Sequence, residues 1–124
     1  MRALVVDDSR AVRLIIAKIL HELGMEVVEA SNGQEALDQI RSDPDVQVAL
    51  VDWNMPVMNG LDFIRAVRAD PVFDPLRILM VTTETESEQV TRALDAGANE
   101  YVMKPFTRDV LVAKLTMLDL CEET

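Results

Sequence analysis

Five residues whose side chains can take part in phosphoryl chemistry stand directly after short apolar runs of the sequence. Asp7 and Asp8 follow the first run, Asp52 follows a second, Thr82 a third and Lys104 a fourth. Runs rich in Val, Ile and Leu, separated by stretches of helix length, are typical of parallel strands buried on both faces. The carboxyl ends of such strands meet at one edge of a sheet, where open α/β sheets bind ligands. We therefore expect three carboxylates, a hydroxyl and an ammonium to converge there.

The three aspartates of this set, Asp7, Asp8 and Asp52, indicate a metal site. Two carboxylates about 5 Å apart repel by roughly 3 kcal/mol at an effective dielectric of about 20. A divalent cation relieves this repulsion, and carboxylate and carbonyl oxygens with several waters suit Mg2+. One aspartate at a strand end most often caps a helix or faces solvent, but three on two neighbouring strands favour metal binding.

Asp52 is the candidate nucleophile, because an aspartate carboxylate can accept a phosphoryl group as an acyl phosphate. Bound Mg2+ and the ammonium of Lys104 would spread the charge of the in-line transition state. The hydroxyl of Thr82 could donate a hydrogen bond to a phosphoryl oxygen. Strand-end Thr and Lys residues are common, so the prediction depends on the order and spacing of the whole set.

Strand and helix signals alternate five times along the chain. Ser9 is a candidate N-cap of the first helix and Gly24 its stop, while the mixed polarity of residues 26–30 suits an edge strand. The pattern predicts an α/β (βα)5 flavodoxin-like, doubly wound three-layer sandwich with a parallel five-stranded sheet in the order 2-1-3-4-5. Helices are expected at about residues 10–23, 34–41, 87–96 and 107–120. A further helix is expected to follow residue 60 and to end at about residue 69.

The composition points to one domain, residues 1–124, in a soluble cytoplasmic protein. Twelve Lys and Arg against 22 Asp and Glu give a net charge of -10, which argues against binding DNA. No apolar stretch approaches the roughly 18 residues of a membrane span. The single cysteine, Cys121, allows no internal disulfide and suits a reducing compartment. We expect a monomer without nucleic-acid or membrane partners.

The motif set resembles the receiver domain of two-component response regulators, and is most similar to the CheY-type chemotaxis regulators. The similarity covers essentially the whole chain. The motifs that carry it are Asp7-Asp8, Asp52-Trp53-Asn54-Met55-Pro56, Met58-x-Gly60-Leu61, Met80-Val81-Thr82 and Tyr101-Val102-Met103-Lys104-Pro105-Phe106.

The resemblance assigns roles at the acceptor itself. It implies that Asp52 is the phosphoacceptor, and that Mg2+ is held by Asp8, Asp52 and the backbone carbonyl of Asn54. Asp7 would act through a metal-bound water. Asn54 would also tune the phosphoryl chemistry, and the bond between Lys104 and Pro105 would be cis.

The resemblance also implies roles around the acceptor. Thr82 and Tyr101 would form a switch pair that responds to phosphorylation. Thr83 stands where small residues govern access to the phosphoryl group, and Glu84 where the phosphoryl lifetime is tuned. The fourth and fifth helices would contribute to an output surface, although the simplest interpretation of cations there, such as Lys114, is a solvated face.

The implied function is a phosphoacceptor switch that assists its own phosphorylation and dephosphorylation, rather than an enzyme. Its partners would be a histidine kinase or histidine phosphotransfer protein, and a phosphorylation-dependent target such as the flagellar switch. A phosphorelay intermediate or a kinase-associated adaptor remains an alternative. An aspartyl-phosphate phosphatase is disfavoured because Asn54 stands where its general acid is needed, and an FMN carrier because Asp7 and Asp8 would repel the phosphate.

Overall fold

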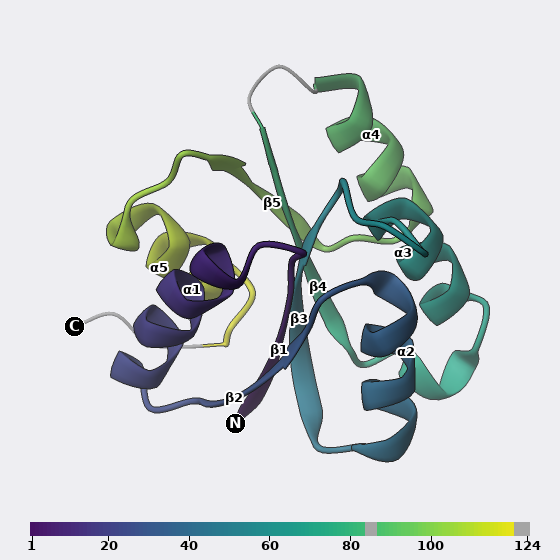
Figure 1. The fold of residues 1–124 in the computed structure, drawn as a ribbon, viewed down its shortest axis with the longest axis horizontal. Coiled ribbons are helices and arrows are strands. Elements are labelled where there is room, and N and C mark those ends of the chain that lie inside the picture. Colours follow the sequence, from purple (N-terminus) through teal and green to yellow (C-terminus); the bar gives the residue numbers. More distant parts are fainter. Residues whose placement is uncertain (84–86, 121–124) are drawn as a thin grey trace.

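The computed structural model describes residues 1–83 and 87–120, so Glu84 and Cys121 lie outside the described residues. Five parallel strands form one sheet in the order β2-β1-β3-β4-β5, which confirms the predicted topology (Figure 1). The strands are β1 (Arg2–Val6), β2 (Glu26–Ala30), β3 (Val46–Asp52), β4 (Arg77–Thr83) and β5 (Glu100–Lys104).

Helices cover both faces of the sheet and complete the predicted three layers. In Figure 1, α1 and α5 lie on one face, and α2, α3 and α4 lie on the other. A short 3-10 helix, η1 (Pro71–Phe73), precedes β4 and was not predicted. The α-helices are α1 (Arg10–Glu22), α2 (Gly33–Ser42), α3 (Gly60–Arg68), α4 (Ser87–Ala96) and α5 (Arg108–Met117). Among the described residues, none of these helices combines the length and apolar character needed to cross a membrane.

The central strands are continuous apolar runs because helices bury both of their faces. Along β3, Val48 and Leu50 pack into a core cluster shared with α1 and α5. The alternate residues Ala49 and Val51 pack into the cluster under α2, α3 and α4. At the edge of the sheet, β2 carries exposed Glu26 and Glu29, as its mixed polarity predicted. Burial of the three inner strands therefore fixes their register and the position of every strand end.

Helix ends are set by local hydrogen bonds that the sequence shows only in part. The Ser9 side chain accepts from Val12 N at 3.3 Å, which confirms the predicted N-cap of α1. Gly24, with φ of 85°, ends α1 as predicted. The last helix stops at Met117 rather than residue 120, because Asp119 adopts a φ of 59° and closes the helix end. Asp119 is a weaker stop signal than glycine, which explains the overestimated length.

Candidate functional site

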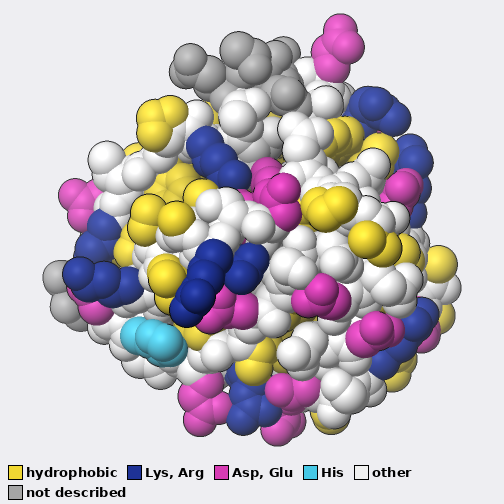
Figure 2. Space-filling view, in the orientation of Figure 1, with side chains coloured by type: hydrophobic (Ala, Val, Ile, Leu, Met, Phe, Trp, Pro, Cys, Tyr) yellow, Lys and Arg dark blue, Asp and Glu magenta, His cyan; other side chains and the backbone are white. Residues whose placement is uncertain are grey.

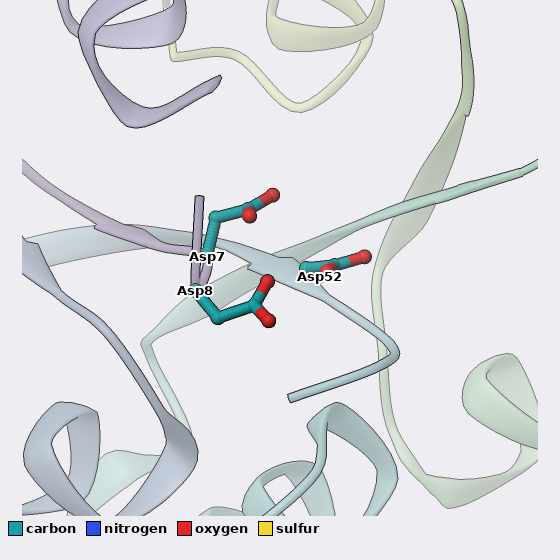
Figure 3. A group of neighbouring side chains, drawn as sticks. All are labelled: Asp7, Asp8 and Asp52. Atoms are coloured by element: carbon teal, nitrogen blue, oxygen red, sulfur yellow. The ribbon is translucent and has the colours of Figure 1, made fainter. Parts of the chain in front are cut away.

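Three carboxylates meet where β1 and β3 end. The two strands are neighbours, with Val6 paired to Val51, so Asp7 and Asp8 come out of the sheet beside Asp52. One carboxylate oxygen from each aspartate lies within 4.8 Å of the others. In Figure 3 the three side chains project to the same side of the sheet edge. The predicted convergence of these residues is therefore present in the structure.

Asp7 is buried, with 2% of its surface exposed, and four of its polar atoms are hydrogen-bonded. Its backbone N–H donates to the Ala30 carbonyl at 3.1 Å, and its carbonyl accepts from Arg13 Nη1 at 2.6 Å. Its carboxylate accepts from Ser9 N at 2.8 Å through Oδ1 and from Lys104 Nζ at 2.9 Å through Oδ2. Asp7 is therefore held as a fixed part of the site.

Lys104 joins the aspartates from the end of β5. Its Nζ atom lies 2.9 Å from Asp7 Oδ2 and 3.3 Å from Asp52 Oδ1. Burial by itself lowers the pKa of Lys104, but the hydrogen bond to Asp7 and the charges of Asp52 and Asp7 outweigh burial and raise that pKa. The side chain therefore remains a cation between the two carboxylates. Its peptide bond to Pro105 is cis.

The side chain of Asp52 is largely buried, with 12% exposed. Burial raises its pKa, and the charge of Asp7 adds to this effect. The charge and hydrogen bond of Lys104 act in the opposite direction without cancelling burial. An ionised Asp52 is therefore held at a cost in free energy in the metal-free protein.

The donor set fits Mg2+ by charge and by ligand type. Three carboxylates and one ammonium leave a formal charge of -2, which a divalent cation balances. Asp8 is exposed, so one carboxylate of the cluster faces solvent, from which a hydrated ion can enter. Mg2+ favours oxygen ligands and keeps several waters. Asp7, Asp8 and Asp52 each offer a carboxylate oxygen to such an ion, and the carboxylate of Asp7 also accepts hydrogen bonds from Ser9 N and Lys104 Nζ.

Two glycines fix the loop that follows Asp52. Gly60 N donates to the Trp53 carbonyl at 3.0 Å, and a Cβ atom at Gly60 would collide with the carbonyl oxygen of Asp52. Gly33 N donates to the Met58 carbonyl at 2.9 Å, and a Cβ atom there would lie 2.7 Å from that oxygen. Only glycine therefore allows α3 to begin so close to the end of β3, and α2 to begin so close to the loop at Met58.

The register of β4 and β5 places the remaining predicted residues. Asp52 pairs with Val81, so Thr82 is the next residue along the neighbouring strand, and it is buried. Thr83 pairs with Lys104 and is exposed. Tyr101, near the start of β5, is half-buried against the core cluster under α2, α3 and α4. Thr82 is thus beside Asp52, whereas Tyr101 lies further along the sheet.

The positions expected to tune the reaction are placed only in part. Asn54 lies exposed in the loop, two residues beyond Asp52. Thr83 stands at the rim of the site, while Glu84 lies outside the described residues. The roles of all three, and the metal contact of the Asn54 carbonyl, stay predictions.

An apolar groove of ≈ 410 Å³ opens beside Lys104. Figure 2 shows hydrophobic side chains gathered over α1 and α5, on the side of the molecule where this groove lies. The exposed side chain of Ile15 extends the apolar surface along α1. The groove is lined by Val12, Ile15, Thr83, Lys104, Pro105 and Phe106.

Sequence reasoning did not predict the contacts of three side chains around the site. Arg13, which holds the Asp7 carbonyl, stands on α1 without a motif that marks it. Arg92 of α4 lies 5.9 Å from the centre of the Trp53 ring. Lys114 lies 4.6 Å from the centre of the Tyr101 ring, so the interpretation of Lys114 as a solvated cation is wrong. The Arg92 contact joins elements far apart in sequence, whereas those of Arg13 and Lys114 join consecutive elements through long side chains whose direction no local pattern encodes.

Comparison with known proteins agrees with this geometry. The family model for the response regulator receiver domain matches residues 3–116. Chemotaxis protein CheY1 of Helicobacter pylori is 48% identical over 119 residues, which cover 95% of this chain and 96% of that protein. A chemotaxis protein CheY homolog of Campylobacter jejuni is 48% identical over 93% of this chain and 89% of its own length.

Solved structures extend the similarity to three dimensions. The chemotaxis response regulator CheY4 of Vibrio cholerae superposes with a TM-score of 0.86 at 36% identity, over 94% of this chain and 97% of that one. The family match includes the strand ends that carry the acidic cluster. The chain belongs to the response regulator receiver family.

Proposed function

We propose that this chain is a CheY-type response regulator that accepts a phosphoryl group on Asp52 and then changes its affinity for a downstream protein. The observation that supports this most directly is the Asp52 carboxylate, largely buried and 3.3 Å from the ammonium of Lys104. Its position within the Asp7 and Asp8 cluster adds a place for Mg2+. A carboxylate with a fixed cation and a metal site beside it is suited to phosphoryl transfer.

In the transfer, a carboxylate oxygen of Asp52 attacks the phosphorus of a phosphohistidine in line. An O–P bond forms as the P–N bond breaks, and the electron pair of that bond passes to the imidazole nitrogen. Lys104 neutralises charge that develops on the phosphoryl oxygens, and Asp7 keeps Lys104 in position through its hydrogen bond. Mg2+, held by Asp8, Asp52 and the Asn54 carbonyl, would supply further charge neutralisation when bound. Water later hydrolyses the acyl phosphate and restores the carboxylate.

The phosphodonor is a histidine kinase or a histidine phosphotransfer protein. The apolar groove along Val12, Ile15 and Phe106 supports a protein donor, because a small phosphate ester needs no apolar surface beside the acceptor. We further propose that the chain acts in the cytoplasm as a monomeric regulator. Assisting its own phosphorylation makes the chain a switch rather than an enzyme with a separate substrate.

Phosphorylation is transmitted through Thr82 and Tyr101. The Thr82 hydroxyl would move toward the phosphoryl oxygens, which makes room for the Tyr101 ring to turn inward. Packed interiors hold a few discrete arrangements, so a small hydroxyl movement can select between two ring positions. The relatives named for chemotaxis favour a target in motility control, such as the flagellar switch. A phosphorelay or adaptor role would use the same acceptor chemistry with a different target.

Phosphorylation by acetyl phosphate with Mg2+ tests the acceptor. We expect a phosphoryl mass increment by intact mass spectrometry, which is lost in Asp52→Asn and retained in Asp62→Asn, a matched change of an exposed aspartate on α3. Labelling that survives Asp52→Asn, or an adduct stable to hydroxylamine, would contradict the assignment.

An affinity pull-down with and without beryllofluoride, an aspartyl-phosphate mimic, tests the role of the switch. A flagellar switch component that binds only with beryllofluoride supports motility control. A histidine phosphotransfer protein that accepts the phosphoryl group back from Asp52 would support the relay alternative instead.

A further inference from the structure

Three side chains at the edge of the sheet form a closed cluster on the far side of β5 from the acidic site. The Lys114 ammonium lies 4.6 Å from the centre of the Tyr101 ring and 3.1 Å from Glu100 Oε1. The same Glu100 oxygen accepts a hydrogen bond from Tyr101 N at 3.0 Å. Glu100 and Lys114 are both mostly buried, with 17% and 23% of their side chains exposed. Solvent therefore screens this pair less than a fully exposed one.

The cluster joins the two helical layers across the edge strand. The Tyr101 ring packs against the core cluster under α2, α3 and α4, while the next residue, Val102, packs into the cluster under α1 and α5. Lys114 comes from α5, so its side chain crosses the edge of β5 to reach the ring. The ammonium contacts the ring and also has its charge paired by Glu100. The ring is thus held from outside the core by a cation whose own position is fixed.

We propose that Lys114, anchored by Glu100, is a positioning residue that retains the Tyr101 ring in the observed orientation and so biases the chain toward its resting conformation. This inference rests on the proposed function, in which that ring turns inward on phosphorylation. A ring that turns away from Lys114 loses the cation–π contact, so the contact stabilises the resting state alone. A contact of this kind shifts a two-state equilibrium by about two- to five-fold.

The inference predicts the same result for two substitutions, of which one removes a positive charge and the other a negative charge. Lys114→Gln removes the cation, and Glu100→Gln removes its anchor. We measure the beryllofluoride concentration at which half of the protein has changed from the resting to the active conformation. In both variants we expect this concentration to fall by about two- to five-fold relative to wild type. Conversion is followed by NMR of the Tyr101 ring. In the double variant this concentration should be no lower than in Lys114→Gln, because the two residues act through one contact.

Two further variants serve as controls. Arg108→Gln removes a cation from the same helix, where Arg108 pairs with Glu22 rather than with the ring, and should behave as wild type. Lys114→Arg keeps both the charge and the ring contact, and should also behave as wild type even if Lys114→Gln loses stability. A wild-type response in Lys114→Gln overturns the inference, and so do shifts of opposite direction in Lys114→Gln and Glu100→Gln.

The experiment separates failure of this inference from failure of the proposed function. If beryllofluoride leaves the Tyr101 ring of the wild-type protein unchanged, the proposed switch is wrong. If the wild-type ring responds and the Lys114 and Glu100 variants respond at the same concentration, only the positioning role is wrong.

Discussion

Arg13 Nη1 donates a hydrogen bond of 2.6 Å to the backbone carbonyl of Asp7. The guanidinium is oriented in turn by Glu29 of β2, whose Oε1 lies 3.0 Å from Arg13 Nε. The contact therefore links α1 and β2 to the turn on which Asp7 and Asp8 stand. Groups that orient metal ligands from outside affect metal affinity although they do not touch the ion.

Arg13→Ala should weaken Mg2+ binding by about ten-fold, because the turn that presents Asp8 loses its anchor. The measurement is a Mg2+ titration followed by fluorescence of Trp53, the single tryptophan, which adjoins Asp52. Arg10→Ala, at an exposed position on the same helix, is the control and should retain the wild-type affinity or bind slightly more tightly. Equal affinities for the two variants would show that Arg13 acts only through its charge.

Asp8→Ala should make the metal-free protein more stable by about 1 kcal/mol, because one of three mutually repelling carboxylates is removed from the exposed side of the cluster. Thermal melts with and without millimolar Mg2+ measure the effect. Mg2+ should raise the melting temperature of wild type more than that of the variant. Asp45→Ala, exposed at the opposite edge of the sheet, should change neither melt. An unchanged wild-type melting temperature in Mg2+ would refute the metal site.

Asp52→Asn should stabilise the metal-free protein in a pH-dependent way, since burial raises the pKa of Asp52 in the folded state. Below the unfolded-state pKa the carboxyl is protonated in both states and contributes nothing. As the pH rises from that value through the raised folded-state pKa, the unfolded chain ionises first and the wild-type free energy of unfolding falls. The loss is complete above the folded-state pKa. Denaturant unfolding of both proteins in EDTA across this pH window should show that the difference in their free energy of unfolding grows and then levels off. A difference that does not depend on pH would contradict the prediction.

Val57→Asn should raise the free energy of unfolding by about 1 kcal/mol. Val57 is 83% exposed and has a φ of 67°, a left-handed conformation that a β-branched side chain disfavours and asparagine tolerates. Urea denaturation measures the change. Val72→Asn, at another exposed valine, in η1, is the control and should bring no gain. A gain at both positions would mean that exposure rather than backbone strain is responsible.

Thr82→Ala should still accept a phosphoryl group on Asp52, because the nucleophile, Lys104 and the carboxylate cluster are unchanged. The variant should lose most of the phosphorylation-dependent binding to its target, since the hydroxyl that would respond to the phosphoryl group is absent. Mass spectrometry and a binding assay with beryllofluoride measure the two properties separately. Thr83→Ala, on the exposed neighbouring residue, should retain the binding. Full target binding by Thr82→Ala would remove Thr82 from the proposed relay.

The convergence of Asp7, Asp8, Asp52 and Lys104 could be predicted from the sequence because it depends on one property of parallel sheets. Strand polarity sends all carboxyl ends to one edge, and burial on both faces makes each inner strand a continuous apolar run. The number of helices follows from the same alternation, whereas the strand order 2-1-3-4-5 comes from the flavodoxin-like fold pattern.

The contacts of Arg13 and Lys114 could not be predicted in this way. Each depends on the direction that a long side chain takes from its helix back toward the preceding strand, which the residue pattern does not specify. The left-handed conformation of Val57 is a similar case, because a β-branched residue does not signal a positive φ. These features follow from tertiary packing, which overrides local preference.

The close approach of Gly60 to the carbonyl of Asp52 has a consequence for engineering this chain. A side chain at position 60 would collide with the Asp52 carbonyl, so a label cannot be attached at this glycine without moving the end of β3. The turn at Pro44 and Asp45 lies at the opposite edge of the sheet, where Asp45 is exposed. A reporter fluorophore, an affinity handle or an inserted domain belongs in that turn, where added chain length is tolerated.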